Sequence, residues 1–240
     1  MSMPPFPPSE AIAPVVWPPP PTNTANVLTD EQRRAFAQLS KYQSPIALSH
    51  WIVGSLAITF VVQFAQTACL LLGPAAAKLE SITSDVSAFT AMAGGMFFLI
   101  WIRQLYQNLT FLGVPGLQYS PMSAATAFLI PIVSIYKPIK IMAEIWKATS
   151  PSSVLYFVSG HWAQTPSTPL ITAWWALFTI YNSINFLIAL NMDISQFKVI
   201  NDEADLLFSA INGALLAILI LRLTKREESR YREIYASLQN

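Results

Sequence analysis

Long uninterrupted runs of hydrophobic residues dominate the pattern of this chain, and polar or charged residues gather between them. Four runs are long enough, or nearly long enough, to cross a bilayer: Ile46–Leu72, Val86–Tyr106, Leu170–Leu190 and Leu206–Leu223. About 20 apolar residues cross the hydrocarbon core as a helix, because every backbone N–H and C=O must be bonded internally there. Only 11% of the residues are charged, against about 25% in a soluble globular chain. The pattern therefore predicts an all-α integral membrane protein with four transmembrane helices.

A fifth apolar stretch, between residues 123 and 136, is too short for a full crossing. Fourteen helical residues reach about 21 Å, whereas the hydrocarbon core is about 30 Å thick. Pro131 would break the helix within this stretch, and Pro138 suits the first turn of a new helix. We expect residues 123–148 to form a proline-broken helical hairpin that is re-entrant or lies in the membrane interface.

The second helix of this hairpin should be amphipathic, as a helix lying in the interface is. Its polar and apolar positions recur at helical spacing: Lys137, Lys140, Glu144 and Lys147 on one face, and Ile139, Met142, Ile145 and Trp146 on the other. We also hypothesise that the hairpin brings Glu144 next to Arg103, at the end of the second run. An ion pair between them would hold the hairpin against the second span.

The positions of lysine and arginine predict how the spans are oriented. With four crossings, twelve of the 14 basic residues lie on one side of the membrane. They are Arg33, Arg34, Lys41, Arg103, Lys137, Lys140, Lys147, Arg222, Lys225, Arg226, Arg230 and Arg232. Because basic residues favour the cytoplasmic side, we expect both termini to be cytoplasmic. A fifth crossing would instead place the hairpin lysines and the basic C-terminus outside.

This reading divides the chain into four parts. Nine of the eighteen prolines stand in the first 22 residues, so the N-terminal tail should be extended. That tail is either a solvated leader or a strip that docks on a partner through Phe6 and Trp17. The parts are the tail at 1–29, a short cytoplasmic helix at 30–45, the membrane domain at 46–224 and a C-terminal amphipathic cytoplasmic helix at 225–240.

The polar residues inside the predicted spans are mainly amides rather than ionisable groups. They are Gln63, Gln66, Asn182, Asn185 and Asn212. An amide that faces lipid is costly, whereas one that faces another helix can hydrogen-bond across the contact. Proton- and ion-coupled transporters usually place Asp, Glu or His within a span. We therefore expect polar helix–helix contacts at these positions, and the alternative is a lining for a small polar solute.

No group of residues in the sequence predicts catalysis, a cofactor or a metal site. His50 and His161 lie at the end of a span and in a loop, and no pair of histidines faces across two spans as a haem site needs. Cys69 is the only cysteine, which excludes an intrachain disulfide. Motifs for a nucleophile, a phosphate loop or nucleic-acid binding are absent. The expected partners are the lipid bilayer and other membrane protein subunits.

One segment of the chain resembles a known family. Its matching residues are Trp101, Arg103, Asn108-Leu109, Leu112-Gly113, Ser120-Pro121, Ile130-Pro131-Ile132, Tyr136-Lys137-Pro138, Met142, Glu144-Ile145-Trp146-Lys147-Ala148 and Ser150-Pro151. In these residues the chain resembles the bacterial membrane family named domain of unknown function 4328 (DUF4328). The resemblance covers residues 46–225 and is strongest at 101–151. It implies a bacterial plasma membrane, and it brings no activity, substrate or catalytic residue with it.

Together these features favour a non-enzymatic protein that acts as an accessory, scaffolding or assembly subunit of a larger membrane complex. The first alternative is a transporter or channel-like protein with a polar path between the amide residues. The second is a membrane-anchored regulator that recruits a partner through its proline-rich tail. A cavity that reaches the middle of the membrane near Asn182 and Gln63 would favour transport.

Overall fold

The computed structural model describes residues 30–72, 77–130, 132–150, 161–191 and 198–239. Several sequence predictions lie outside this part of the chain: the proline-rich tail with Phe6 and Trp17, the break at Pro131, and the side-chain contacts of Asn185. They stay predictions.

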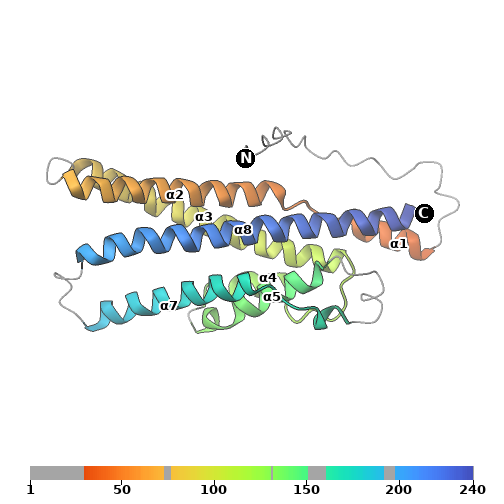
Figure 1. Cartoon of the computed structure of the whole chain (residues 1–240). Helices are drawn as coiled ribbons and strands as arrows, with labels where there is room; N and C mark the ends of the chain where they lie inside the picture. The colour runs from red at the N-terminus through yellow and green to blue at the C-terminus, as the bar shows by residue number, and fades with distance from the viewer. Residues whose placement is uncertain (1–29, 73–76, 131, 151–160, 192–197, 240) are drawn as a thin grey trace, which may run out of the picture.

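Four long helices make up most of the described structure: α2 (Ile46–Leu72), α3 (Ala77–Phe111), α7 (Pro169–Asn191) and α8 (Lys198–Gln239). They run alongside one another in alternating directions (Figure 1). The described residues contain no strand. The helices α2, α3 and α8 are long and apolar enough to cross a membrane. The prediction of an all-α protein with helices able to cross a membrane is confirmed, and the count of four crossings stays a prediction.

Both α3 and α8 extend well beyond the apolar runs that they contain. With 35 and 42 residues, they measure about 52 Å and about 63 Å. The helix α3 begins at Ala77 rather than at Val86, because the intervening Ala, Lys, Leu and Glu residues are good helix formers. The helix α8 continues without a break past Leu223, so the predicted C-terminal helix is the last part of α8.

The chain between α3 and α7 folds into short elements. They are α4 (Pro121–Thr126), η2 (Val133–Ile135), α5 (Lys137–Ala148) and η3 (His161–Gln164). Gly113 and Gly116 turn the chain after α3 with φ angles of 75° and 73°, a conformation that favours glycine. Pro138 stands in the first turn of α5, as predicted. The segment folds back on itself beside α7 (Figure 1).

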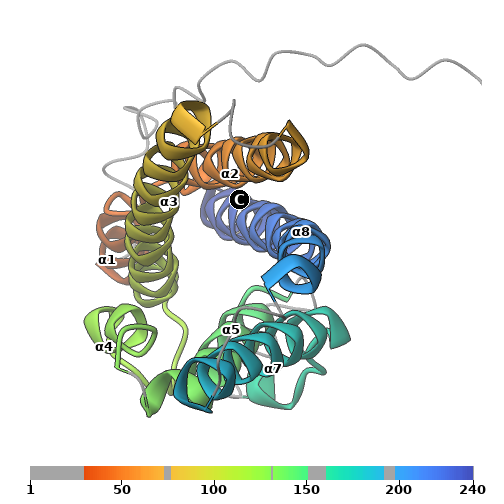
Figure 2. The ribbon, with the colours of Figure 1, turned by 90° about the vertical axis from the view of Figure 1, so that its left-hand side faces the viewer.

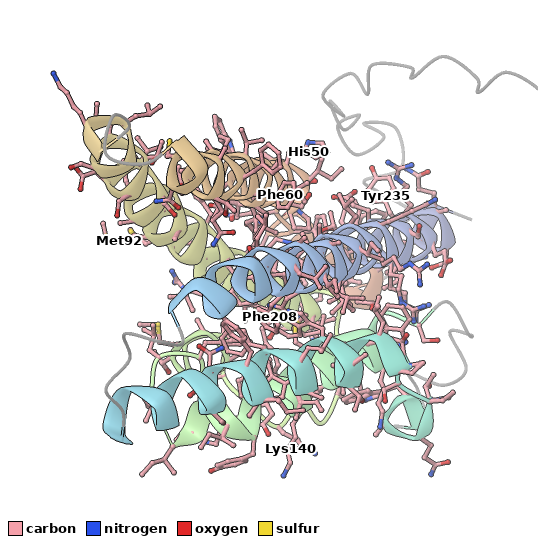
Figure 3. The ribbon with its side chains drawn as sticks, turned by 60° about the vertical axis from the view of Figure 1, so that its left-hand side comes forward. His50, Phe60, Met92, Lys140, Phe208 and Tyr235 are labelled. Atoms are coloured by element: carbon pink, nitrogen blue, oxygen red, sulfur yellow. The ribbon has the colours of Figure 1, made fainter. Side chains whose placement is uncertain are left out.

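The helices pack in a defined order around the bundle. The helices α2 and α3 form one pair, α8 lies against α2, and α7 packs against both α8 and α5 (Figure 2). Gly94 allows the close approach of α3 to α2, since a Cβ there would lie 2.5 Å from Ser55 Oγ. The fully buried side chains belong mainly to the later part of α3, to α5 and to α8, whereas Lys140 points away from the bundle (Figure 3).

The short helix α1 (Asp30–Leu39) packs on the last turns of α8. Phe36 contacts Tyr235 edge-on, with ring centroids 5.9 Å apart, and Tyr42 stacks on Tyr231 at 4.1 Å. The start of the described chain and its C-terminal end therefore lie at the same end of the bundle (Figure 1).

Candidate functional site

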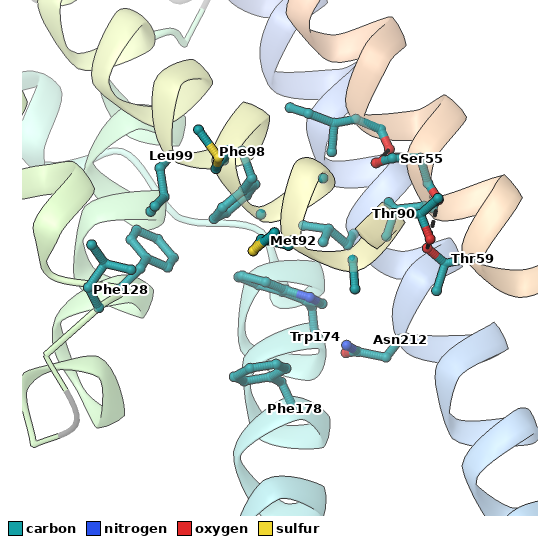
Figure 4. Close-up of a pocket in the computed structure, with 18 of the residues that line it drawn as sticks. Ser55, Thr59, Thr90, Met92, Phe98, Leu99, Phe128, Trp174, Phe178 and Asn212 are labelled. Carbon is teal, nitrogen blue, oxygen red and sulfur yellow. Dashed lines mark hydrogen bonds between the residues drawn. The ribbon is translucent and has the colours of Figure 1, made fainter. Parts of the chain in front are cut away.

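A cavity of about 760 Å³ lies between the four long helices and the hairpin; we call it the central cavity. Aromatic and aliphatic side chains make most of its wall, among them Phe98 of α3 and Trp174 of α7 (Figure 4). Met92, Met96 and Leu129 line it and are 65%, 59% and 64% exposed. The cavity is therefore open to the side of the bundle, between α3 and the hairpin.

Two buried polar atoms of the cavity wall, Trp174 Nε1 and Asn212 Oδ1, have no hydrogen-bond partner among the described residues. Figure 4 shows the indole nitrogen of Trp174 and the amide of Asn212 directed toward each other from α7 and α8. An indole N–H donates and an amide oxygen accepts, so hydroxyl or amide groups of an occupant would supply partners for these atoms. An unpaired buried atom costs about 1–3 kcal/mol, so the site favours an occupant that carries such a group.

Hydroxyl side chains form a second polar point in the wall. Thr59 Oγ1 and Thr90 Oγ1 lie 3.3 Å apart across the contact of α2 with α3, and each donates to a carbonyl of its own helix at 2.9 Å. None of the described lining residues is Asp, Glu, Lys, Arg or His. The cavity is thus mostly apolar with isolated uncharged polar groups, which suits an uncharged occupant.

The structure brings some of the predicted amide residues together. Gln63 of α2 accepts a hydrogen bond from the Ser209 hydroxyl of α8, which is the kind of interhelical contact expected for it. Asn182 and Asn212 both line the central cavity, but Asn182 donates to the Phe178 carbonyl of its own helix at 2.7 Å. Gln66 is half-buried on α2. The central cavity therefore reaches Asn182, whereas Gln63, which bonds to Ser209, is not among the lining residues.

A second group of polar residues, gathered around the buried side chains of Asn108, Glu227 and Glu228, lies at the end of the bundle that holds α1. We call it the end cluster; it consists of Tyr42, Gln43, Asn108, Glu227 and Glu228. The amide nitrogen of Asn108 donates to the Gln43 carbonyl at 2.7 Å and to Glu227 Oε1 at 2.6 Å. The amide oxygen of Asn108 accepts from the Gln43 backbone N–H at 3.2 Å, and Tyr42 donates to Glu228 at 3.2 Å.

Burial changes the pKa of two groups in the end cluster. The α8 residues of this cluster, Glu227 and Glu228, lie beyond Leu223, where the apolar run ends. Burial raises the pKa of Glu227 well above the ordinary carboxyl value, and the hydrogen bond from Asn108 opposes this shift. Burial also raises the pKa of the Tyr42 hydroxyl, and the nearby Glu227 and Glu228 add to the rise. Both groups therefore favour their neutral forms. The sequence pattern did not predict this cluster, because Glu227 and Glu228 stand in a charged segment, which is typical of a helix exposed to water.

The contacts of Glu144 correct the expected ion pair with Arg103. The carboxylate of Glu144 accepts hydrogen bonds from the Tyr106 hydroxyl at 2.9 Å and from the Gln118 backbone N–H at 2.8 Å. Glu144 is only 7% exposed, so it does not lie on a solvated face of α5 as predicted. Arg103 is exposed and is not paired with it. The hydroxyl and N–H groups satisfy Glu144 without the cost of burying a second charge.

The other predicted hairpin residues tie α5 to its neighbours. Pro138 is buried in the first turn of α5. The Arg226 guanidinium of α8 lies over the Trp146 ring, 4.1 Å from its centroid. Near the start of α5, Trp175 of α7 donates from Nε1 to the Ile135 carbonyl at 2.9 Å. Both α7 and α8 thus hold the hairpin in place.

Comparison with known families identifies the group to which this architecture belongs. A family model described as Domain of unknown function (DUF4328) matches residues 74–228, which is more than half of the chain. The chain belongs to the DUF4328 family. The resemblance seen in the sequence is therefore confirmed. Comparison with curated proteins and with solved structures yields no match.

The DUF4328 match contains most but not all of the two sites. Trp174, Asn212, Asn108 and Glu227 lie within it, whereas α1 and α2 precede it. Thr59 of the central cavity and Tyr42 and Gln43 of the end cluster thus come from outside the DUF4328 segment. The described residues hold no group of three or more His, Cys, Asp or Glu side chains placed to bind a metal ion.

Proposed function

We propose that this DUF4328 protein spans the plasma membrane of a bacterium four times, through α2, α3, α7 and α8, with both termini in the cytoplasm. The 23 residues of α7 include no charged side chain and reach about 34 Å. Tyr181 of α7 stacks on Phe208 of α8 at 3.7 Å, which pairs α7 with a helix able to cross a membrane. Two observations support placing both termini on the same side. Phe36 contacts Tyr235, and with four crossings twelve basic residues lie on one side.

The hairpin is proposed to enter the membrane and return on the side from which it came. Phe128 packs edge-on against Phe98, with centroids 5.1 Å apart. Phe98 lies thirteen residues before the end of α3 at Phe111, about 20 Å along the helix. Ile132, in the same hairpin, is 78% exposed, which suits contact with lipid. The chain returns through α5 to Trp146, beside Arg226.

The proposed role is that of a non-enzymatic accessory or assembly subunit of a larger membrane complex. The observation that carries it is the open central cavity, with Trp174 Nε1 and Asn212 Oδ1 buried and unpaired at its wall. A transmembrane helix of another subunit, carrying a hydroxyl or amide side chain, would fill the opening and satisfy both atoms. Small exposed residues in the lining, Ala91 and Gly95, favour the close approach of such a helix.

The second candidate is a protein that binds or carries a small uncharged solute. The central cavity has about 760 Å³, within the range of about 300–1,000 Å³ found for small-molecule pockets. Asn182 and Asn212 in its wall fit the alternative of an amide-lined site. The same two unpaired atoms would then bond to a hydroxyl group of the solute.

Photo-crosslinking from the cavity distinguishes these roles. A photoreactive amino acid replaces Met92, which lines the cavity, in the full chain in native membranes. The matched control carries it at Phe64, which is 60% exposed on α2 and lies outside the cavity lining. We expect a protein adduct of defined mass from position 92 and not from position 64.

Two other results would change the conclusion. Loss of the position-92 adduct with an added solute, or a small-molecule adduct, would support the second candidate. Diffuse lipid adducts of equal yield from both positions would contradict a subunit at the cavity.

A further inference from the structure

A second, smaller cavity of about 380 Å³ lies at the end of the apolar part of α8. Its lining is one face of α8 together with Trp146 of α5; we call it the basic pocket. The α8 residues recur at three- and four-residue spacing and therefore share that face. They are Arg222, Lys225, Arg226, Ser229, Arg230 and Glu233.

The charge of the basic pocket is strongly positive. Four of its residues are basic and one, Glu233, is acidic and pairs with Arg230 at 3.3 Å. The neighbouring acids of α8 face elsewhere, since Glu227 bonds to Asn108 and Glu228 to Tyr42. Within the described chain, Arg222, Lys225 and Arg226 form no ion pair. Three positive charges in the pocket are therefore not neutralised by a carboxylate.

Arg226 is held in a fixed orientation at this site. One terminal nitrogen of its guanidinium donates to the Trp146 carbonyl at 3.0 Å, and the group lies over the Trp146 ring at 4.1 Å. Its Nε is buried and has no partner among the described residues. A preorganised guanidinium suits a phosphate group, which offers several acceptor oxygens.

The pocket lies at the depth where lipid headgroups are found. The apolar stretch of α8 ends at Leu223, between Arg222 and Lys225. A helix that crosses the membrane passes from hydrocarbon to the headgroup layer at this kind of boundary. Basic pockets between helices at this level bind the headgroups of anionic lipids.

We propose that the basic pocket binds the phosphate headgroup of an anionic glycerophospholipid. The lipid phosphate accepts hydrogen bonds from Arg222, Lys225 and Arg226, and its acyl chains follow the apolar part of α8. This assignment requires that α8 cross the membrane, and it does not depend on what fills the central cavity.

Native mass spectrometry of the purified full chain tests the proposal, with phosphatidylglycerol and phosphatidylcholine added in turn. The wild type should retain phosphatidylglycerol in preference to phosphatidylcholine. Each cation near a lipid surface changes the affinity about fivefold, so Arg222→Gln should weaken phosphatidylglycerol binding about fivefold. The triple change Arg222→Gln, Lys225→Gln, Arg226→Gln should abolish the preference.

Arg232→Gln is the matched control, because Arg232 is exposed on the same helix outside the pocket. It should leave phosphatidylglycerol binding unchanged. Melting temperatures of the variants show whether each one is folded, and Arg222→Gln alone carries the test if the triple variant does not fold. Equal losses in Arg222→Gln and Arg232→Gln would overturn the proposal, and displacement of the lipid by millimolar inorganic phosphate would identify free phosphate as the ligand instead.

Discussion

At Asn108 a single side-chain amide joins α3 to the segment before α2 and to α8. It makes three hydrogen bonds, two with the Gln43 backbone and one with Glu227, which is fully buried. Asn108→Ala leaves the Glu227 carboxyl buried without a donor, and an unsatisfied buried group costs about 1–3 kcal/mol or more. We predict that Asn108→Ala destabilises the protein by about 3 kcal/mol, seen as a lower melting temperature in detergent.

The control at this scale is Thr110→Ala, two residues further along α3. Thr110 is exposed, and its hydroxyl donates to the Tyr106 carbonyl of its own helix at 3.4 Å. Its loss should change stability by less than about 0.5 kcal/mol. Equal melting temperatures for Asn108→Ala and the wild type would show that the end cluster does not stabilise the fold.

At the scale of the elements, the hairpin is held by Glu144 rather than by an ion pair. Glu144→Ala leaves the Tyr106 hydroxyl and the Gln118 N–H without their acceptor, so we predict a loss of about 2–3 kcal/mol. The reduced stability should also make the segment after α3 more sensitive to limited proteolysis. Arg103→Ala should have almost no effect, because Arg103 is exposed.

Charge reversal tests directly whether Glu144 pairs with Arg103 or instead accepts hydrogen bonds from Tyr106 and Gln118. If Arg103 and Glu144 were paired, Arg103→Glu combined with Glu144→Arg would recover the stability that either change loses. We expect no recovery, because an arginine at position 144 cannot accept hydrogen bonds from Tyr106 and Gln118. Recovery in the double variant would restore the ion-pair hypothesis.

Sequence patterns predict the bounds of some helices correctly and of others only in part. The run Ile46–Leu72 matches the bounds of α2 at both ends, because it is bounded by Pro45 and by Gly73-Pro74. The run Val86–Tyr106 is only the apolar middle of α3, since hydropathy marks where a helix could lie in lipid and not where the helix begins. Pro138 places the start of α5 correctly, because proline is acceptable in the first turn.

At the scale of the whole molecule, the number of crossings decides which ends share a side. Single cysteines at Gln164, Ser237 and Lys78, in a Cys69→Ala background, report this directly; all three positions are exposed. With four spans, Gln164→Cys and Ser237→Cys react with an impermeant thiol reagent only from the cytoplasmic side. Lys78→Cys reacts from outside in intact cells. Five crossings would instead make all three react from outside, which would contradict the proposed topology.

By itself, the sequence determined the helical class, the presence of runs apolar enough to cross a membrane, the family and the order of basic residues along the chain. These depend on local properties, namely run length, proline positions and the order of charges along the chain. Only the tertiary structure decided that Trp174 faces Asn212, that Asn108 meets Glu227, and that Glu144 bonds to Tyr106 instead of Arg103. Such contacts join residues far apart in the chain, 119 positions for Asn108 and Glu227, and depend on how each helix is rotated against its neighbours. Neither hydropathy nor charge order specifies that rotation.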